Sequence, residues 1–269
     1  MLYEKISLDK ENSQVYLEAY VADKIEGFTR DAILVIPGGG YYNICSDREG
    51  EPIGMAFMPY GFNAFVLHYS VKENSSKTFP TQLIEASKAI KYIKDNAEKY
   101  NINPERVFAV GFSAGGHLCG SLATMWNKEE IYKEIDMPYG YNKPTGVMLI
   151  YPVISLKHHV FSFKNLLGKE EFTEADHKLV SIDQNVSEDS SPMYIMHTTN
   201  DEAADIGNSV ALANALVEKR LMFEMHIYPD APHGVALGNR ITKCDCEKWD
   251  NPSIAKWVEN AAEWAKSIK

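Results

Sequence analysis

The sequence has few cysteines, no excess of basic residues and no long apolar run. Its 269 residues include 4 cysteines, and their spacing matches neither a zinc site nor a disulfide framework. Few cysteines in such a spacing are typical of a reducing compartment. We interpret Cys244 and Cys246 as two surface-loop thiols rather than as a metal or redox site. The formal net charge of −10 argues against nucleic acids and anionic membrane surfaces as partners.

The N-terminal residues lack the apolar stretch of a signal peptide, and no later stretch approaches the length of a membrane span. The sequence therefore predicts a cytoplasmic protein. Hydrophobic residues make up 45% and charged residues 24%, which are ordinary values for a globular domain. Since there is no internal repeat, low-complexity tract or linker, we expect a single domain over residues 1–269 with a sizeable core.

Short apolar runs alternate with helical patterns along most of the chain, which predicts an α/β protein with a mostly parallel, doubly wound sheet. Residues 2–21 suggest two additional strands in an antiparallel hairpin at one sheet edge. Residues 157–191 are the least regular segment, and we expect a small lid of short helices and loops there. The runs predicted as strands in the parallel part are 31–36, 64–69, 106–110, 146–151, 193–197 and 223–228.

Apolar spacing also predicts the helices and their buried faces. Helices are expected at 51–58, 80–100, 117–123, 209–219 and 254–268. In the fourth, the residues expected to point inward are Val210, Ala213, Leu216 and Val217. In the last helix they are Trp257, Val258, Ala261, Trp264 and Ile268.

Residues 111–115 match Gly-x-Ser-x-Gly, with Ser113 between the apolar run 106–110 and the small residues of 117–123. A serine on a sharp turn between a strand and a helix is a nucleophile elbow. The turn crowds the positions two before and two after the serine, so glycine is favoured at both. The N–H of Ala114, at the start of a helix, would face a developing negative oxygen. The alternative is a glycine-rich turn with an idle serine.

A serine hydroxyl needs a base that takes its proton and a third group that holds the base. After a nucleophile elbow the acid and then the histidine follow along the chain. His233 comes after the last predicted strand, between proline and glycine, and we predict that it is the general base. His226 lies inside a predicted strand and His197 ends one. His158, His159 and His177 lie in the polar segment predicted as a lid. His117 lies four residues after Ser113, and we interpret it as a packing or capping residue.

The acid is expected in the loop between strand 193–197 and helix 209–219, because loops at the carboxyl ends of the strands hold the partners of such a serine. Asp201 has the favoured place in this loop. Glu202 and Asp205 lie close enough to compete. We predict that Asp201 orients the base.

Three consecutive glycines follow the strand that ends at residue 36. A phosphate-binding loop is the alternative interpretation, but Gly-x-x-x-x-Gly-Lys is absent and the spacing does not fit a dinucleotide fingerprint. We expect an oxyanion hole instead, formed by the backbone N–H groups of Gly39, Gly40 and Ala114. Tyr41 and Tyr42 are candidates for lining the acyl pocket, with aromatic packing as the alternative.

With these residues placed, the chain resembles the α/β-hydrolase superfamily, and closely its esterase/lipase branch with acetylesterases similar to acetylxylan esterase. It departs from this family in the acid loop, where Asn200-Asp201 and Ala204-Asp205 replace the usual Asp-Asp and Val-Pro. The resemblance covers nearly the whole chain and rests on residues 37–41, Glu49-Gly50-Glu51-Pro52, residues 111–117, the 197–201 loop with Ser209, and Ala231-Pro232-His233-Gly234.

The resemblance implies an α/β-hydrolase fold and a triad of Ser113, Asp201 and His233, without metal or cofactor. It also implies hydrolysis of short acyl esters, often acetyl groups on sugars. We expect a small-molecule ester substrate, with acetylated xylo-oligosaccharides as a hypothesis, and we leave a homo-oligomeric state open. Two alternatives are a small-amide hydrolase, such as a formamidase or peptidase, and a non-catalytic binding protein on a hydrolase scaffold.

Overall fold

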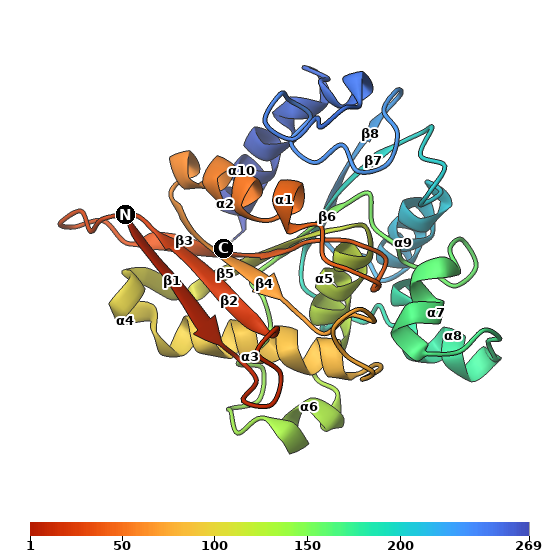
Figure 1. Ribbon diagram of the computed structural model, residues 1–269, viewed down its shortest axis with the longest axis horizontal. Coiled ribbons are helices and arrows are strands. Elements are labelled where there is room, and N and C mark those ends of the chain that lie inside the picture. Colours follow the sequence, from red (N-terminus) through yellow and green to blue (C-terminus); the bar gives the residue numbers. More distant parts are fainter. Residues whose placement is uncertain (269) are drawn as a thin grey trace.

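The apolar runs form one mixed sheet in the computed structural model, which describes residues 1–268 (Figure 1). Its eight strands have the order β1-β2-β4-β3-β5-β6-β7-β8. β1 and β2 form an antiparallel hairpin, β2 is antiparallel to β4, and the other neighbours are parallel. The predicted mostly parallel sheet with antiparallel N-terminal strands is confirmed. The strands are β1 (Leu2–Ser7), β2 (Tyr16–Val21), β3 (Arg30–Ile36), β4 (Phe62–His68), β5 (Ile102–Phe112), β6 (Val147–Ile150), β7 (Met193–Thr198) and β8 (Phe223–Tyr228).

Most helices match the predicted stretches, but α1 and α6 were not predicted, because such short helices show little apolar periodicity. The helix expected at 80–100 is interrupted at Asn96 and forms α3 and α4. The helices are α1 (Ser46–Glu49), α2 (Glu51–Phe57), α3 (Thr81–Asp95), α4 (Ala97–Tyr100), α5 (Ser113–Met125), α6 (Glu129–Glu134), α7 (Phe161–Leu167), α8 (Glu174–Val180), α9 (Gly207–Glu218) and α10 (Trp257–Ser267).

Helices cover both faces of the sheet (Figure 1). Successive side chains of a strand point to opposite faces, so Leu34 and Ile36 of β3 belong to the core under α3, α5 and α9. Ile33 and Val35 belong to the core under α2 and α10. The continuous apolar run of β3 therefore reflects burial on both faces.

The predicted inward face of α9 is wrong in part, whereas that of α10 is buried as expected. Val210 and Val217 are 43% and 62% exposed, and Leu212 lies inside together with Leu216. A polar residue explains the difference. Asn208 is buried, and its Oδ1 accepts the N–H groups of residues 154 and 155, which turns positions 208, 212 and 216 inward.

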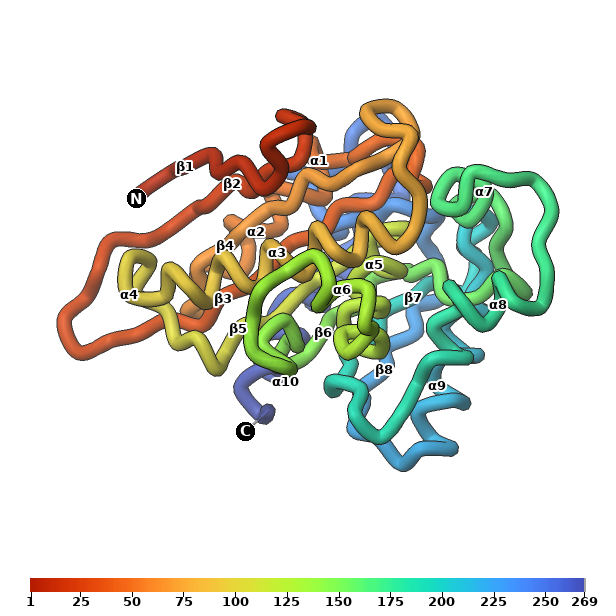
Figure 2. The backbone as a smooth tube through the Cα atoms, turned by 90° about the horizontal axis from the view of Figure 1, so that it is seen from below, coloured from red at the N-terminus to blue at the C-terminus, as the bar shows by residue number. Residues whose placement is uncertain are grey.

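Residues 157–191 contain α7 and α8, at the end of the molecule opposite the N-terminus in both views (Figures 1 and 2). These are the short helices and loops that the sequence predicted there, and their action as a lid stays a prediction. Within residues 1–268, no helix combines the length and the apolar character that crossing a membrane would require.

β5 leads into α5 through the turn at Ser113, and two glycines make this turn sterically feasible. A Cβ on Gly111 would contact the carbonyl oxygen of Gly115 and the side chain of Cys119. A Cβ on Gly115 would collide with the main-chain oxygens of Ile36 and Pro37. The start of α5 therefore lies directly against the end of β3.

We predict that Gly115→Ala lowers the free energy of unfolding by about 1–3 kcal/mol, because the added methyl group overpacks rigid backbone. Urea denaturation followed by circular dichroism measures this change. Gly120→Ala in the same helix is the matched control, since its Cβ would lie 3.4 Å from Ile182, an ordinary contact. In a helix interior this replacement gains roughly 0.5–1 kcal/mol. Equal unfolding midpoints of the two variants would contradict the prediction.

Candidate active site

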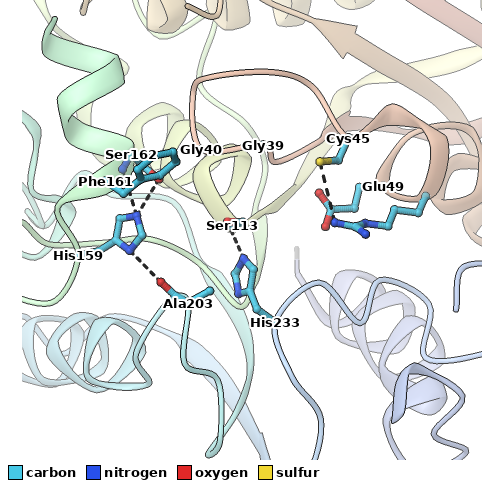
Figure 3. A pocket seen from close by; sticks show the side chains of 11 residues that line it. Gly39, Gly40, Cys45, Glu49, Ser113, His159, Phe161, Ser162, Ala203 and His233 are labelled. Atoms are coloured by element: carbon cyan, nitrogen blue, oxygen red, sulfur yellow. Dashed lines mark hydrogen bonds between the residues drawn. The ribbon is translucent and has the colours of Figure 1, made fainter. Parts of the chain in front are cut away.

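Ser113, His233 and Asp201 are joined by hydrogen bonds at the carboxyl end of the sheet. Ser113 Oγ lies 2.8 Å from Nε2 of His233 (Figure 3). Nδ1 of the same ring lies 2.7 Å from Oδ2 of Asp201. The elbow gives Ser113 a positive φ of 53°, which carries its hydroxyl clear of the sheet. A hydroxyl, an imidazole and a carboxylate in this order can pass the serine proton to the ring.

Asp201 is buried, and several donors hold its carboxylate. Its Oδ1 accepts the N–H groups of Ala203 at 3.0 Å and Ala204 at 2.8 Å, and Oδ2 lies 3.4 Å from Nε2 of His197. Burial alone would raise the pKa of Asp201, but the hydrogen bonds from His197 and His233 outweigh it and lower this pKa below its usual range. The group is therefore an anion that accepts a hydrogen bond from His233.

The two competing acids do not contact His233. Glu202 is exposed. The side chain of Asp205 is 66% exposed, and its nearest basic partner is His158 at 3.9 Å. Of the three acids in the loop, only Asp201 reaches the imidazole.

Asn200, which motif reasoning did not single out as functional, joins the acid loop to the loop that carries His233. Its Nδ2 donates to Oδ1 of Asp230 at 2.9 Å, and its Oδ1 accepts the N–H of Ala231 at 3.0 Å. Thr198 adds a third connection, because its hydroxyl donates to the carbonyl of Ala231 at 2.7 Å. The sequence indicated this position only through its departure from the family, with Asn200 in place of the first residue of the usual Asp-Asp. An asparagine amide has both a donor and an acceptor.

The glycine loop after β3 curves beside Ser113. Gly39 and Gly40 have φ values of 124° and 66°, which glycine adopts readily. A Cβ on Gly40 would lie 2.7 Å from the ring of Phe161, so a side chain there would clash with the pocket wall. Ala114 is the second residue of α5, and the first N–H groups of a helix have no acceptor within it. The N–H of Ala114 is therefore available to an anionic oxygen.

A small pocket of about 190 Å³ opens in front of Ser113. In Figure 3, Cys45 and Glu49 lie on one side of Ser113, and His159, Phe161 and Ser162 lie on the other. The lining consists of Gly39, Gly40, Cys45, Arg48, Glu49, Ser113, His159, Phe161, Ser162, Ala203 and His233. Two parts of the wall, from α1 and from the 157–191 segment, contain no residue that the sequence had predicted for the site. The motif that begins at Glu49 had marked only the family resemblance.

Within residues 1–268, the pocket lining includes neither Tyr41 nor Tyr42. Tyr41 is 1% exposed, and its hydroxyl donates to Nδ1 of His117 at 2.8 Å. Nε2 of His117 donates to the carbonyl of Val180 at 2.7 Å. Tyr42 is 47% exposed. His117 thus packs between elements, as interpreted from the sequence, and Tyr41 belongs to the same buried network.

Residues 17–216 match the BD-FAE family. The chain belongs to this family. The "Endo-1,4-beta-xylanase B" of Butyrivibrio fibrisolvens is 38% identical over 215 residues, which cover 78% of the chain and 33% of that protein. The "Acetylxylan esterase" of Xylanibacter ruminicola is 29% identical over 245 residues, which cover 88% of the chain and 45% of that protein. The BD-FAE chain thus spans between a third and a half of the length of these curated relatives.

Solved structures show the same fold over nearly full length. An acetyl ester-xyloside bifunctional hydrolase from Caldicellulosiruptor lactoaceticus has a TM-score of 0.83 and 30% identity, covering 98% of this chain and 96% of that one. A carboxylesterase from Lactobacillus plantarum has a TM-score of 0.84 and 23% identity, covering 99% and 98%. The predicted α/β-hydrolase fold and the resemblance to its esterase branch are confirmed for this BD-FAE member.

We predict that His117 makes the fold less stable as the pH falls. Burial lowers the pKa of its imidazole from 6.5 to about 4, so the unfolded chain takes up this proton first. The contribution of His117 is fully present above pH 6.5 and declines as the pH falls from 6.5 towards 4. The total is about 3 kcal/mol, since one pKa unit corresponds to about 1.4 kcal/mol.

Urea denaturation at about pH 7.5 and about pH 5 tests this for the wild type and for His117→Gln, whose side chain does not titrate. The variant should lose less of its free energy of unfolding between the two pH values than the wild type does. An equal loss in the two proteins would show that protonation of His117 is not involved.

Proposed function

We propose that the chain is a serine carboxylic-ester hydrolase that works through an acyl-enzyme. The observation that supports this is the hydrogen-bonded series of Ser113, His233 and Asp201 beside a glycine loop, in a member of an esterase-branch family. The relatives named for acetylxylan and acetyl ester hydrolysis support the same reaction class.

In the proposed mechanism, Ser113 Oγ attacks the ester carbonyl while Nε2 of His233 takes its proton. Asp201, held as an anion, stabilises the imidazolium through Nδ1–H. The tetrahedral oxyanion accepts hydrogen bonds from the N–H groups of Gly39, Gly40 and Ala114. Collapse expels the alcohol, which receives the proton from His233. Water then attacks the acyl-enzyme with the same ring as base, and the carboxylic acid leaves.

We propose short acyl groups, acetyl in particular, as the group transferred to water. The small volume of the pocket, about 190 Å³, supports this proposal, since Phe161 on one side and Cys45 on the other restrict the space beside Ser113. The names of the relatives support acetylated xylo-oligosaccharides as substrates. A substrate contact at the exposed Tyr42, a cytoplasmic location and a homo-oligomeric state stay predictions from the sequence.

Ser113→Ala is predicted to lower kcat by about 10⁴–10⁶-fold on an acetyl ester, as loss of the nucleophile does in comparable enzymes. A fluorophosphonate probe should label the wild type and leave this variant unlabelled. Ser121→Ala is the matched control, because Ser121 lies in the same helix and its hydroxyl donates to the carbonyl of His117, away from the pocket lining. A wild type that resists the probe would favour a non-catalytic binding protein, and labelling of Ser113→Ala would place the nucleophile elsewhere.

Acyl length and bond type can be compared on one purified preparation. We expect acetate to be released from acetylated xylo-oligosaccharides with a higher kcat/KM than butyrate or octanoate from matched esters, because longer chains exceed the pocket. Equal or faster turnover of the long chains would remove the acetyl preference. Anilide and formamide substrates in the same assay should be slower, and faster turnover of these would favour a small-amide hydrolase.

A further inference from the structure

One buried carboxylate beside the nucleophile has no part in the mechanism above. Glu49, the last residue of α1, is 2% exposed and lines the pocket. Both of its oxygens accept hydrogen bonds. Oε2 accepts the N–H of Gly38 at 2.8 Å, and Oε1 accepts the hydroxyl of Tyr151 at 2.9 Å. Gly38 directly precedes the two glycines assigned to the oxyanion hole, so this carboxylate holds the first residue of that loop.

Tyr151 extends the contact to the loop of the base. Its hydroxyl donates to Glu49 and accepts the N–H of Ala236 at 3.1 Å. Its ring packs edge-on against His233, with centroids 4.9 Å apart and planes at 67°. Tyr151 is 1% exposed and has a positive φ of 38°, a conformation that costs about 1–3 kcal/mol for a residue other than glycine. The surrounding structure therefore holds the backbone of Tyr151 in this conformation.

The carboxylate also lies close to the nucleophile itself. A Cβ on Gly38 would lie 2.9 Å from both Oε2 of Glu49 and Cβ of Ser113, which shows how little space separates the two side chains. Burial raises the pKa of Glu49, while Arg48, the two donors and His233 favour its ionised form. The ionisable groups that face Glu49 are Cys45, Arg48, Tyr69, Tyr151 and His233.

We propose that Glu49 and Tyr151 are positioning residues for the ester hydrolysis proposed above, on which this inference rests. Glu49 holds the oxyanion loop through Gly38 and, through Tyr151, the loop that carries His233. One carboxylate thus fixes the oxyanion donors relative to the base, although β3 and β8 bring them from distant parts of the chain. Its negative charge also stabilises the imidazolium that forms when Ser113 gives up its proton.

Glu49→Gln removes the negative charge of the side chain and keeps its shape. The amide oxygen can accept the N–H of Gly38, and the amide N–H₂ can donate to the hydroxyl oxygen of Tyr151. We expect kcat to fall roughly 10–100-fold, the effect of weakening one buried charged partner. KM should stay within about 2-fold of the wild-type value, because both oxygens of Glu49 accept hydrogen bonds from within the protein. The acid limb of the pH profile of kcat/KM should move to lower pH, since the variant lacks an anion that favours the imidazolium.

Tyr151→Phe is the second variant, and it keeps the ring against His233. It removes the hydroxyl that links Glu49 to Ala236 but leaves the carboxylate in place. We expect a lower kcat with a smaller displacement of the acid limb than in Glu49→Gln. Because the two variants perturb folding differently, this variant decides the question if Glu49→Gln does not fold.

Glu85→Gln is the matched control. Glu85 is also 2% exposed and also accepts two hydrogen bonds, from the N–H and the hydroxyl of Ser70, but it does not line the pocket. A purely structural role of a buried carboxylate would lower stability in both variants and leave the pH profile unchanged. We expect Glu85→Gln to keep the wild-type kcat and acid limb.

A wild-type kcat and pH profile in folded Glu49→Gln, or in folded Tyr151→Phe where Glu49→Gln does not fold, would overturn the inference. An unmoved acid limb in Glu49→Gln would also overturn it. Probe labelling of wild-type Ser113 is measured alongside. A labelled, active wild type with unaffected variants refutes only the positioning role, whereas an unlabelled, inactive wild type refutes the ester hydrolysis and this inference with it.

Discussion

The arrangement depends on one steric constraint, the contact between the start of α5 and the end of β3. Gly115 lies so close to the carbonyl oxygens of Ile36 and Pro37 that no Cβ can stand between them. This approach sets the turn at Ser113 directly beside the glycine loop. As a result, Ala114 and the glycine loop belong to neighbouring segments, as the proposed oxyanion hole requires.

The remaining groups reach the same point because parallel strands bring their carboxyl ends to one edge of a sheet. The serine directly follows β5 and Tyr151 directly follows β6, while the acid loop follows β7 and the loop of the imidazole follows β8. Loops alone would leave these groups mobile. Side chains join them instead: Asn200 connects the loops after β7 and β8, and Tyr151 connects the turn after β6 to Ala236.

How much of this could be predicted from sequence depends on how local each feature is. The strand, turn and helix around Ser113 lie within consecutive residues, so spacing and glycine chemistry were sufficient to predict them. Of the predicted inward face of α9, Leu216 is buried but Val210 and Val217 are exposed, because Asn208 binds backbone in a distant segment. Tyr41 was predicted as a candidate for the acyl pocket. Residues 39 to 41 all have positive φ values, a backbone path that sequence does not reveal, and the hydroxyl of Tyr41 donates to His117.

Glu49 shows the limit most clearly. Its motif marked a resemblance but not a role, since α1 has only four residues and no apolar period. The hydrogen-bond partners of Glu49 lie in the segments that follow β3 and β6. Burial moves its pKa upward, whereas that of Asp201, which has more donors around it, moves downward. The imidazole therefore has an anion in direct contact on one side and a second, less strongly stabilised carboxylate behind Tyr151. Burial favours the neutral form of both carboxyl groups, and the hydrogen-bond donors around each one favour the charged form. The balance between these two effects determines how firmly each carboxylate stays charged.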